Sequence, residues 1–600
     1  MKLLSIQAIL KGAWQVIQRF PFAMLACLVG TVLGITFIHI DDPEPYVNLM
    51  LTMTFAAPLF VGAVLFSGAM KFSQKYHWAI HGVIAAFLLG YYFLLPDPGV
   101  GVSEYYIRHT MWAIGFVLLV TFIPFAYQHG PAAIRRFWQY NRGLVFALVL
   151  TGIWAGALQA GLSIALASVD FLFEIRIDEE RYAEIWIVLV GIFSPLFFLS
   201  RLPKKPHALD TKQPYPKEVR LFSQFVLVPL VTLYFLILYA YTARILITTT
   251  WPEGQLAWMI LGFSFLGVLT YLALYPLREK VNWVRHFGTG LFVAMIPQTG
   301  MLFWALSFRI RDYGITENRY FVLIFGFWLM AIAIYFLLRR VKDIRLIPAT
   351  IFLIAVVTSV GPWGAFEVAE RSQINRLEGI LVENGLLQDG LYVPASAELS
   401  KDDVLQINEI VRYLSRHHGL DGIEPWFGGE DLDELGNNNW NRAEMVITEK
   451  FGVEEQYFYG RRFEPYEEGY ETFAMFLAPF DSAVLPVGGY DYMMDVAYGE
   501  FGVKTKFMID EQEYQIKLDE SKLVLELVRG DELLATIDFS EKVDQAKGFD
   551  REEFAREDTI VTVENDQVKL LLSIESLFGE VDDGEAEIHT FMGLMLLTIK

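Results

Sequence analysis

The side chains with the clearest chemical potential lie in a short charged segment between two long apolar runs. This segment is Ser307–Tyr320, SFRIRDYGITENRY, with three arginines and two carboxylates. A guanidinium binds phosphate or carboxylate through two parallel hydrogen bonds, so grouped arginines are typical of an anion-binding site. The candidate anion-binding residues are Arg309, Arg311 and Arg319, together with Arg244 from an earlier apolar run and with Asp312 and Glu317 as carboxylates that would orient them.

A purely structural explanation of the same arginines competes with the anion site. Long basic side chains near a bilayer reach lipid phosphates, and they also pair with acids such as Asp312 and Glu317. Within the segment, Gly314 is expected to form a tight turn and Thr316 to cap the helix that follows. The sequence leaves both explanations open.

A second polar group stands inside an apolar run, at Pro297-Gln298-Thr299-Gly300. A proline followed by hydrogen-bonding side chains either breaks a helix that lines a cavity or only kinks it, and a kink is the more frequent outcome. Pro297, Gln298 and Thr299 are therefore possible cavity-lining residues. The centres of the apolar runs lack carboxylates and lysines, which argues against a proton- or sodium-coupled pump.

Other motifs of catalysis or cofactor binding are absent from the sequence. It has no Walker-type phosphate loop, no GxGxxG after a strand, no HExxH and no GxSxG. The single cysteine, Cys27, excludes an intrachain disulfide and a cysteine metal cluster. His417-His418 before Gly419 is explained as the polar end of a helix, and the acidic stretch 430–439 lacks calcium-loop spacing. We expect no metal and no cofactor.

The elements that must hold these residues are membrane-spanning helices. The chain has 600 residues, of which 54% are hydrophobic and 20% charged, and its mean hydropathy is +0.37. A net charge of −21 argues against nucleic acid as a partner and leaves membrane lipid as the expected one. Residues 1–19 are expected to form an amphipathic helix and residues 20–364 a bundle of about 11 transmembrane helices. The expected spans are 20–40, 46–70, 78–96, 109–127, 143–168, 183–200, 221–247, 256–275, 287–308, 319–338 and 344–364.

The charges of the loops predict the orientation of the bundle. Basic loops alternate with acidic ones, and short loops rich in lysine and arginine stay on the cytoplasmic side, so the N-terminus is expected inside. An odd number of spans then places the chain after Trp363 outside, and the arginines of Ser307–Tyr320 become an exception among acidic outer loops. Within one span, the small residues Gly152, Gly156 and Ala160 predict close helix packing.

The remaining residues predict an extracytoplasmic α+β domain. Residues 365–455 are expected to form a helical neck, with helices at 366–386, from Ser400 onward and at 440–450. Residues 456–600 alternate between apolar and polar positions and predict an antiparallel β-sandwich or a barrel-like unit. The expected strands are Phe473–Leu477, Tyr490–Tyr498, Lys504–Ile509, Glu513–Leu518, Leu523–Val528, Leu533–Phe539, Thr559–Val563, Gln567–Ile574 and Phe591–Ile599.

Several stretches together resemble a known family. They are RFPFAMLACLVGTVLG, YYFLLP, RIRDYGITENRYF, RSQINRLEGILVENGLL and GGYDYM. The chain resembles the bacterial multi-pass membrane family catalogued as domain of unknown function 4153, and RIRDYGITENRY is the most specific piece. The resemblance covers nearly the whole chain. It implies the multi-pass membrane architecture, and it implies no particular activity.

Three functions are open at this point. The first is a bacterial cytoplasmic-membrane protein that handles an anionic envelope lipid or lipid-linked group in an outer vestibule lined by the arginines. The second is an envelope sensor or scaffold that binds a partner through its extracytoplasmic domain. The third is a membrane-embedded glycosyltransferase, for which the acidic pair Asp41-Asp42 just outside the first span is the only sign. The sequence does not decide whether the protein is an enzyme, and it leaves the oligomeric state open.

Overall fold

The computed structural model of the chain forms two compact units, residues 1–456 and 457–600, which are described separately. The described residues of the first unit are 6–40, 43–96, 103–173, 177–209, 215–248, 255–339, 341–393 and 399–428. Those of the second unit are 471–477, 489–498, 506–509, 512–519, 523–530, 532–546, 552–554, 559–582 and 585–600.

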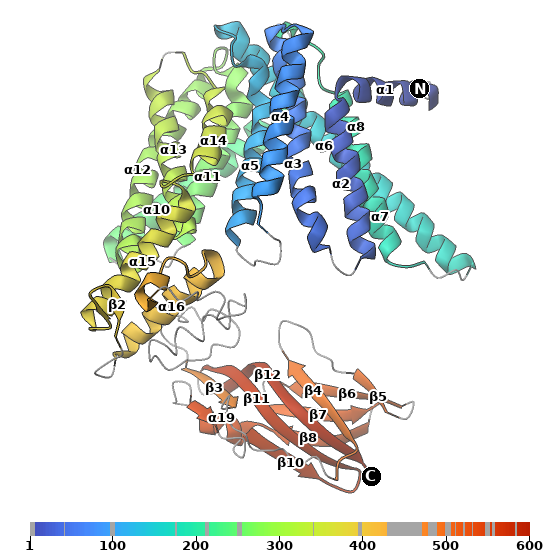
Figure 1. Ribbon diagram of the computed structural model, residues 1–600, viewed down its shortest axis with the longest axis vertical. Coiled ribbons are helices and arrows are strands. Elements are labelled where there is room, and N and C mark those ends of the chain that lie inside the picture. The colour runs from blue at the N-terminus through green and yellow to red at the C-terminus, as the bar shows by residue number, and fades with distance from the viewer. Residues whose placement is uncertain are drawn as a thin grey trace. The chain divides into compact units, whose positions relative to one another are not determined.

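Long apolar helices make up most of the first unit (Figure 1). Among the described residues, ten helices are long and apolar enough to cross a membrane. The helices are α2 Pro21–His39, α3 Glu44–Met70, α4 Gln74–Leu94, α5 Ser103–Phe122, α6 Pro131–Phe173, α7 Glu180–Val188 continued by α8 Ser194–Ser200, α9 Lys217–Phe222 continued by α10 Val228–Thr248, α11 Gln255–Leu274, α12 Asn282–Tyr313 and α13 Glu317–Leu338.

The predicted membrane bundle is confirmed, with one difference at its last span. A shorter apolar helix, α14 Leu346–Val357, stands where the span 344–364 was expected. It ends early because Gly361, at a φ of +78°, and Pro362 start a turn that helical backbone does not allow. The chain is thus an integral membrane protein whose described part has ten apolar helices of spanning length and one shorter apolar helix.

The N-terminal helix α1, Ile6–Arg19, lies across one end of the bundle (Figure 1). Leu10 and Trp14 are 64% and 59% exposed and lie four positions apart, on one face of the helix. At its last residue, Arg19 donates hydrogen bonds of 2.8 Å to the carbonyl oxygens of Leu202 and Pro203. The exposed apolar face and the anchored basic end fit a helix that lies in a membrane interface.

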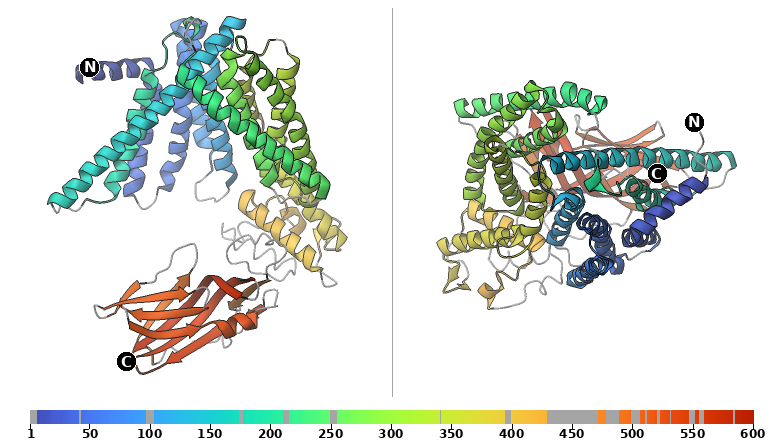
Figure 2. Two further views of the ribbon diagram at one scale, coloured as in Figure 1. Left: turned by 180° about the vertical axis from the view of Figure 1, so that it is seen from behind. Right: turned by 90° about the horizontal axis from the view of Figure 1, so that it is seen from above.

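The described part of the bundle has two large hydrophobic cores and a small third cluster formed by Leu274, Leu277 and Val284. One gathers side chains of α1 to α5 with α8, and the other gathers α10 to α14 with the first turns of α6. Figure 2 shows α6 and α10 diverging from the end of the bundle where they start. A Cβ added to Gly152 or Gly156 would meet nothing within 4 Å, and Ala160 is exposed. The predicted close packing at these small residues is therefore wrong within the described part of this chain.

The start of α14 is tied to the turn after α5 by Arg345. Its Nη1 donates to the carbonyl oxygens of Phe125 at 2.9 Å and Gln128 at 2.5 Å, and its Nη2 lies 2.6 Å from Asp343 Oδ2. One guanidinium therefore satisfies two carbonyls at the end of the short helix η1 Ile123–Phe125 and one carboxylate. Phe125 and the residues Ile344 and Ile347 beside Arg345 belong to one hydrophobic core, which this contact closes at its polar edge.

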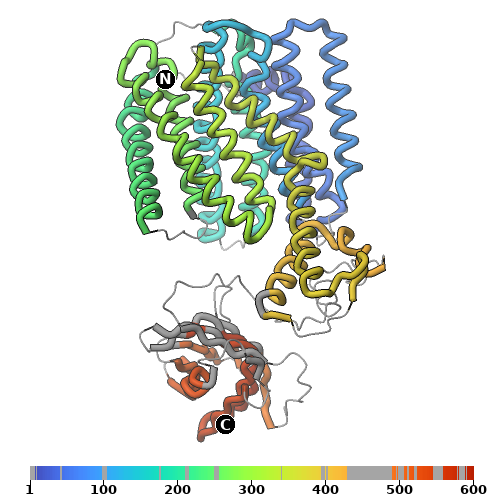
Figure 3. The backbone as a smooth tube through the Cα atoms, turned by 90° about the vertical axis from the view of Figure 1, so that its left-hand side faces the viewer, coloured from blue at the N-terminus to red at the C-terminus, as the bar shows by residue number. Residues whose placement is uncertain are grey.

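At the opposite end of the bundle lies a small helical subdomain, residues 365–428 (Figure 3). It contains α15 Ala365–Glu383, the hairpin β1 Leu387–Gln388 and β2 Leu391–Tyr392, α16 Lys401–His417 and the short helix η6 Glu424–Phe427. Its core is formed by apolar residues at helical spacing, such as Leu377 and Leu381 against Val411 and Leu414. As predicted, Ser400 starts α16, and its Oγ accepts the backbone N–H of Asp403 at 3.1 Å. The helix expected at 440–450 lies outside the described residues.

The second unit is a β-sandwich, as predicted. Its larger sheet has the strand order β4-β12-β11-β3-β9, with β10 paired to β11, and its smaller sheet has the order β5-β6-β7-β8. Buried apolar residues of both sheets, including Ile516, Leu527, Leu572 and Phe591, share one core. The elements are β3 Glu471–Leu477, β4 Tyr492–Tyr498, β5 Lys506–Ile509, β6 Gln512–Asp519, β7 Val524–Arg529, β8 Glu532–Asp538, α19 Ser540–Ala546, β9 Glu552–Phe554, β10 Ile560–Glu564, β11 Val568–Asp582 and β12 Glu585–Ile599.

Candidate functional site

The charged segment forms a sharp turn between two helices of the bundle. α12 ends at Tyr313 and α13 begins at Glu317. Between them, Gly314 adopts φ 68° and ψ −173°, a conformation essentially restricted to glycine, and its N–H donates to the carbonyl of Ile310 at 2.9 Å. The turn at Gly314 is as predicted. Thr316 occupies the capping position of α13, but its side chain makes no capping hydrogen bond.

This turn rests on α15 through side-chain hydrogen bonds to its backbone. Ser372 Oγ accepts the N–H of Ile315 at 2.8 Å. Gln373 Nε2 donates to the carbonyls of Tyr313 at 3.0 Å and Ile315 at 3.1 Å. The backbone groups that a tight turn leaves free are thus satisfied by the helical subdomain.

Three guanidinia gather at this turn, and we call Arg309, Arg319 and Arg376 the arginine group. Arg319 Nη1 donates to the carbonyls of Tyr313 at 3.0 Å and Gly314 at 2.8 Å. The guanidinia of Arg319 and Arg376 lie 5.5 and 5.7 Å from the centre of the Tyr313 ring. The charged side chains that act electrostatically on Arg319 are Arg309 and Arg376, which are cations like itself.

The other predicted anion-binding residues are placed differently. Arg311 and Asp312 are exposed in the last turn of α12, and Arg244 is exposed near the end of α10. Among the described residues, no hydrogen bond or ion pair connects these three with the arginine group. Arg376, by contrast, was not among the predicted residues. It lies in α15, about sixty positions further along the chain, and the sequence contains no signal that brings it to this turn.

Glu317 faces the helical subdomain. Its Oε1 lies 2.7 Å from His418 Nε2, and its Oε2 accepts a hydrogen bond from the hydroxyl of Tyr413. Glu317 and His418 are both buried, with side-chain exposures of 11% and 2%. Its described partners are therefore residues of α16 and its C-cap, not the arginines that it was expected to orient.

His418 also joins a chain of charges that reaches α5. Its Nδ1 lies 3.9 Å from Glu104 Oε2, and Glu104 in turn pairs with Arg108 one helical turn away. Arg108 lies 3.6 Å from Glu367 Oε1 on α15. We call Glu104, Arg108, Glu317, Glu367, Tyr413 and His418 the carboxylate–histidine cluster; it links α5, α13, α15 and the end of α16.

The surroundings of the cluster shift the pKa of several groups in the subdomain, among them Glu370 and Tyr413. Burial raises the pKa of Glu370, and the negative charges of Glu367 and Asp421 raise it further, while His418 opposes them. Burial also raises the pKa of Tyr413, and the charge of Glu317 adds to this. Tyr413 therefore remains a neutral hydroxyl that donates to Glu317 at physiological pH.

The polar group around Pro297 lies inside a continuous helix. α12 runs without interruption through Pro297, which is consistent with the kink and not with a broken helix. Gln298 and Thr299 are fully buried. Gln298 Oε1 accepts from Thr242 at 3.3 Å, and Thr299 Oγ1 donates to the carbonyl of Met295 at 2.9 Å. Their role in lining a cavity stays a prediction.

The sequence interpretation missed most of the carboxylate–histidine cluster. As predicted, His418 lies at the polar end of a helix, as the C-cap of α16 with Gly419 after it, but its side chain is also buried between two carboxylates. The spacing of Glu104 and Arg108, four positions apart, was the one local signal of an ion pair. The rest of the cluster depends on how α16 packs, which no local pattern reveals.

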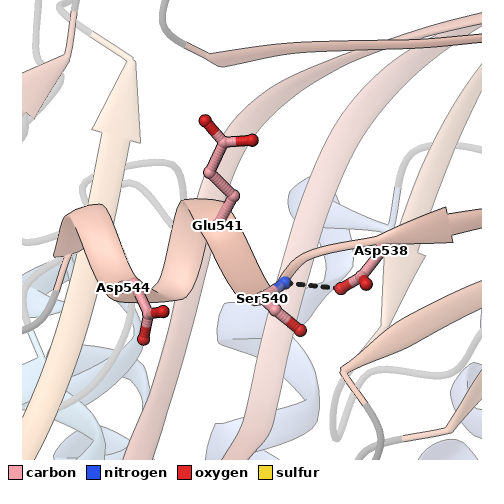
Figure 4. A pocket seen from close by; sticks show the side chains of 4 residues that line it. All are labelled: Asp538, Ser540, Glu541 and Asp544. Atoms are coloured by element: carbon pink, nitrogen blue, oxygen red, sulfur yellow. Dashed lines mark hydrogen bonds between the residues drawn. The ribbon is translucent and has the colours of Figure 1, made fainter.

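In the second unit, a pocket is lined by Asp538, Ser540, Glu541 and Asp544 (Figure 4). Asp538 Oδ1 accepts the backbone N–H of Ser540 at 2.8 Å, and hydrogen bonds from Ser540 lower the pKa of Asp538. Asp538 thus accepts a backbone N–H at the start of α19, a position that favours a carboxylate.

Within the described ranges, no group of three or more histidine, cysteine or acidic residues is arranged to hold a metal ion. The acidic pair Asp41-Asp42 and the stretch 430–439 lie outside those ranges.

Comparison with known proteins gives two similarities. The family model described as "Domain of unknown function (DUF4153)" matches residues 27–407, which is more than half of the chain. An uncharacterized protein of Pasteurella multocida (strain Pm70) is 24% identical over 396 residues. That alignment covers 65% of this chain and 64% of the relative. No solved structure matches the chain.

Proposed function

This chain belongs to the family of domain of unknown function 4153, and from that premise we propose that it binds the headgroup of an anionic lipid at the turn between α12 and α13. The arginine group supplies the positive charge. The helical subdomain supplies one of the three arginines and supports the turn. The ligand class is a phosphate-bearing lipid or lipid-linked group of the bacterial envelope.

The observation that carries this proposal is the charge around Arg319. Its charged neighbours are two more guanidinia, and within the described residues no carboxylate pairs with it. Cations that face one another repel unless an anion lies between them, and guanidinia bind phosphate oxygens through forked hydrogen bonds. A phosphate bound by two or three of these arginines would remove the repulsion.

The surroundings of the arginine group suit a headgroup at the membrane surface. Trp304, Phe308 and Tyr313 are 48%, 41% and 50% exposed along the last turns of α12. Exposed aromatic side chains of this kind gather where a helix leaves the hydrocarbon region. A lipid phosphate lies at this depth, whereas a soluble anion would have to approach from water.

The charges at the opposite end of the bundle support a proposal for the side of the membrane on which this turn lies. Basic residues gather at that end, with Arg135 and Arg136 in the first turns of α6 and Arg278 and Lys280 between α11 and α12. Basic short loops stay in the cytoplasm, which supports a cytoplasmic N-terminus and an extracytoplasmic helical subdomain. On this basis the lipid belongs to the outer leaflet of a bacterial cytoplasmic membrane.

Replacing Arg309 and Arg319 together by glutamine is expected to weaken lipid binding about tenfold or more, because two charge-assisted hydrogen-bond donors are lost. The measurement is the occupancy of phosphatidylglycerol, titrated into the detergent-solubilised full chain and read by native mass spectrometry. The matched control is Arg339→Gln, which removes an exposed arginine from the other end of α13.

Two results would contradict the proposal. One is equal phosphatidylglycerol occupancy in the double variant and in Arg339→Gln. The other is full competition by millimolar inorganic phosphate together with equal retention of a zwitterionic lipid, which would identify a site for a soluble anion. An unchanged thermal unfolding midpoint in the double variant shows that the fold is intact and that the loss is local.

A second candidate function, binding of a protein partner, is favoured by the construction of the second unit. This unit has a core of its own, and its surface exposes Met493, Met508, Leu533 and Met592. Met493 and Met592 lie on adjacent strands of the larger sheet, β4 and β12, and could contact a partner there. If the unit only recruits a partner, deleting residues 457–600 should abolish the partner-dependent phenotype and leave phosphatidylglycerol occupancy unchanged.

A further inference from the structure

We propose that Glu104, His418 and Glu317 form a proton-binding site that fastens the helical subdomain to the end of the bundle. The ligand is a proton held by the imidazole between two carboxylates. This inference concerns the carboxylate–histidine cluster alone. It stands whether or not the arginine group binds a lipid.

The geometry at His418 suits the protonated ring. Its Nε2 lies 2.7 Å from Glu317 Oε1, and its Nδ1 lies 3.9 Å from Glu104 Oε2, on the opposite side of the ring. A neutral imidazole has one N–H and can donate to one side only, whereas an imidazolium donates on both sides. Only the charged form interacts favourably with both carboxylates at once.

Because His418 is buried, its charge strongly affects the attraction between α16, α5 and α13. The side chains of His418, Glu317 and Glu104 are 2%, 11% and 17% exposed, so water screens their charges poorly. When the His418 ring is neutral, the carboxylates of Glu104 and Glu317 lie on its two sides with no positive charge between them. The contact between α16, α5 and α13 then loses its attraction and acquires a repulsion.

The other charged groups at this contact also favour a proton on His418. Arg108 is already paired with Glu104 and Glu367, so it cannot neutralise Glu317 as well. Glu370 and Asp421 add negative charge from the subdomain side, with Arg371 as the further cation beside them. The contact therefore holds more carboxylates than guanidinia, and the proton on His418 adds one positive charge to it.

Two neighbours titrate in opposite directions. Burial and nearby acids raise the pKa of Glu370, so acid also removes this charge and favours docking. Burial lowers the pKa of His417, so a proton on His417 disfavours docking. The Tyr413 hydroxyl stays neutral across this range and keeps its hydrogen bond to Glu317. The net expectation is that the subdomain docks more tightly at acidic than at basic pH.

The test is hydrogen exchange of the full-length protein in lipid nanodiscs at about pH 5.5 and about pH 8.5. Protection factors, which correct for the intrinsic effect of pH on exchange, are compared for amides of residues 413–424 and of the first turn of α13. We expect these factors to fall about tenfold or more between the acidic and the basic condition. Amides in the centre of α13 serve as an internal reference that should not change.

The variants separate this site from other titrating groups. His418→Asn and Glu317→Gln should each reduce the pH effect to about twofold or less, because either change removes one charge of the central pair. The matched control is His417→Asn, which alters the adjacent histidine and should retain the pH effect. The proposal is overturned if His418→Asn and Glu317→Gln keep the full change. A wild-type protection factor that is equal at both pH values also overturns it.

Discussion

Replacing Gly314 with alanine is expected to destabilise the protein by about 2–4 kcal/mol and to loosen the α12–α13 turn from α15. At φ 68° and ψ −173° the backbone lies in a region that side chains other than that of glycine essentially do not enter. An added Cβ would also lie 2.9 Å from Gln373 Nε2 and 3.1 Å from Ser372 Oγ. Backbone strain and the displaced hydrogen bonds therefore both contribute to the loss of stability. The measurement is the thermal unfolding midpoint of the purified protein in detergent.

The matched control for this change is Gly300→Ala in the same helix. Gly300 lies within α12, has helical φ, and has nothing within 4 Å of an added Cβ. Alanine is favoured over glycine in a helix interior by about 0.5–1 kcal/mol, so this variant should be as stable as the original or slightly more. A midpoint for Gly314→Ala equal to that of Gly300→Ala would show that the turn does not need its glycine conformation.

Replacing Arg345 with alanine is the second change with a large expected effect, a loss of about 2–4 kcal/mol. It removes the Arg345 donor from the carbonyls of Phe125, which keeps the N–H of Gln128, and of Gln128, and it leaves Asp343 without its guanidinium partner. Because Arg345 is 17% exposed and Asp343 24%, water replaces these bonds only partly. The thermal midpoint should fall, and proteolysis near residues 126–130 should become faster.

Arg345→Lys tests which property of the side chain matters. Lysine keeps the charge beside Asp343 but lacks the fork that reaches two carbonyls, so it should recover only part of the loss. Arg339→Ala, which removes an exposed arginine six positions earlier, should change the midpoint little. If Arg345→Lys is as stable as the original protein, the bonds to Phe125 and Gln128 contribute nothing.

The fold could be predicted from the sequence because its elements are defined by local patterns. Apolar runs of bilayer length give the helices of the bundle, closely for Glu317–Leu338 against the expected span 319–338 and less closely for Pro131–Phe173 against 143–168. Alternating residues give the strands in the same way, as in Glu532–Asp538 against 533–539. The prediction of close packing from the small residues of α6 was wrong. Small residues allow another helix to approach closely, but they do not show that a neighbouring helix is present.

The candidate site was predicted in part, for a related reason. The segment 307–320 stands out locally by its charge, and Gly314 and Arg319 have the expected places at the turn. Arg376 and His418 arrive from α15 and the C-cap of α16, and their partners lie about 60 to 300 positions away in the chain. Contacts at such separations depend on the packing of whole helices. A single sequence does not contain that information in readable form.

The length of α6 has a consequence for the membrane around this protein. Its 43 residues extend about 65 Å, roughly twice the hydrocarbon thickness of an ordinary bilayer. Large apolar side chains stay exposed up to its end, with Phe171 at 85% and Phe173 at 68%. To keep them in lipid, the helix must lean strongly from the membrane normal, and the angle changes with bilayer thickness. The acyl-chain length of the host lipids therefore sets the tilt angle of α6 and, with it, the distance between the end of α6 and the neighbouring helices.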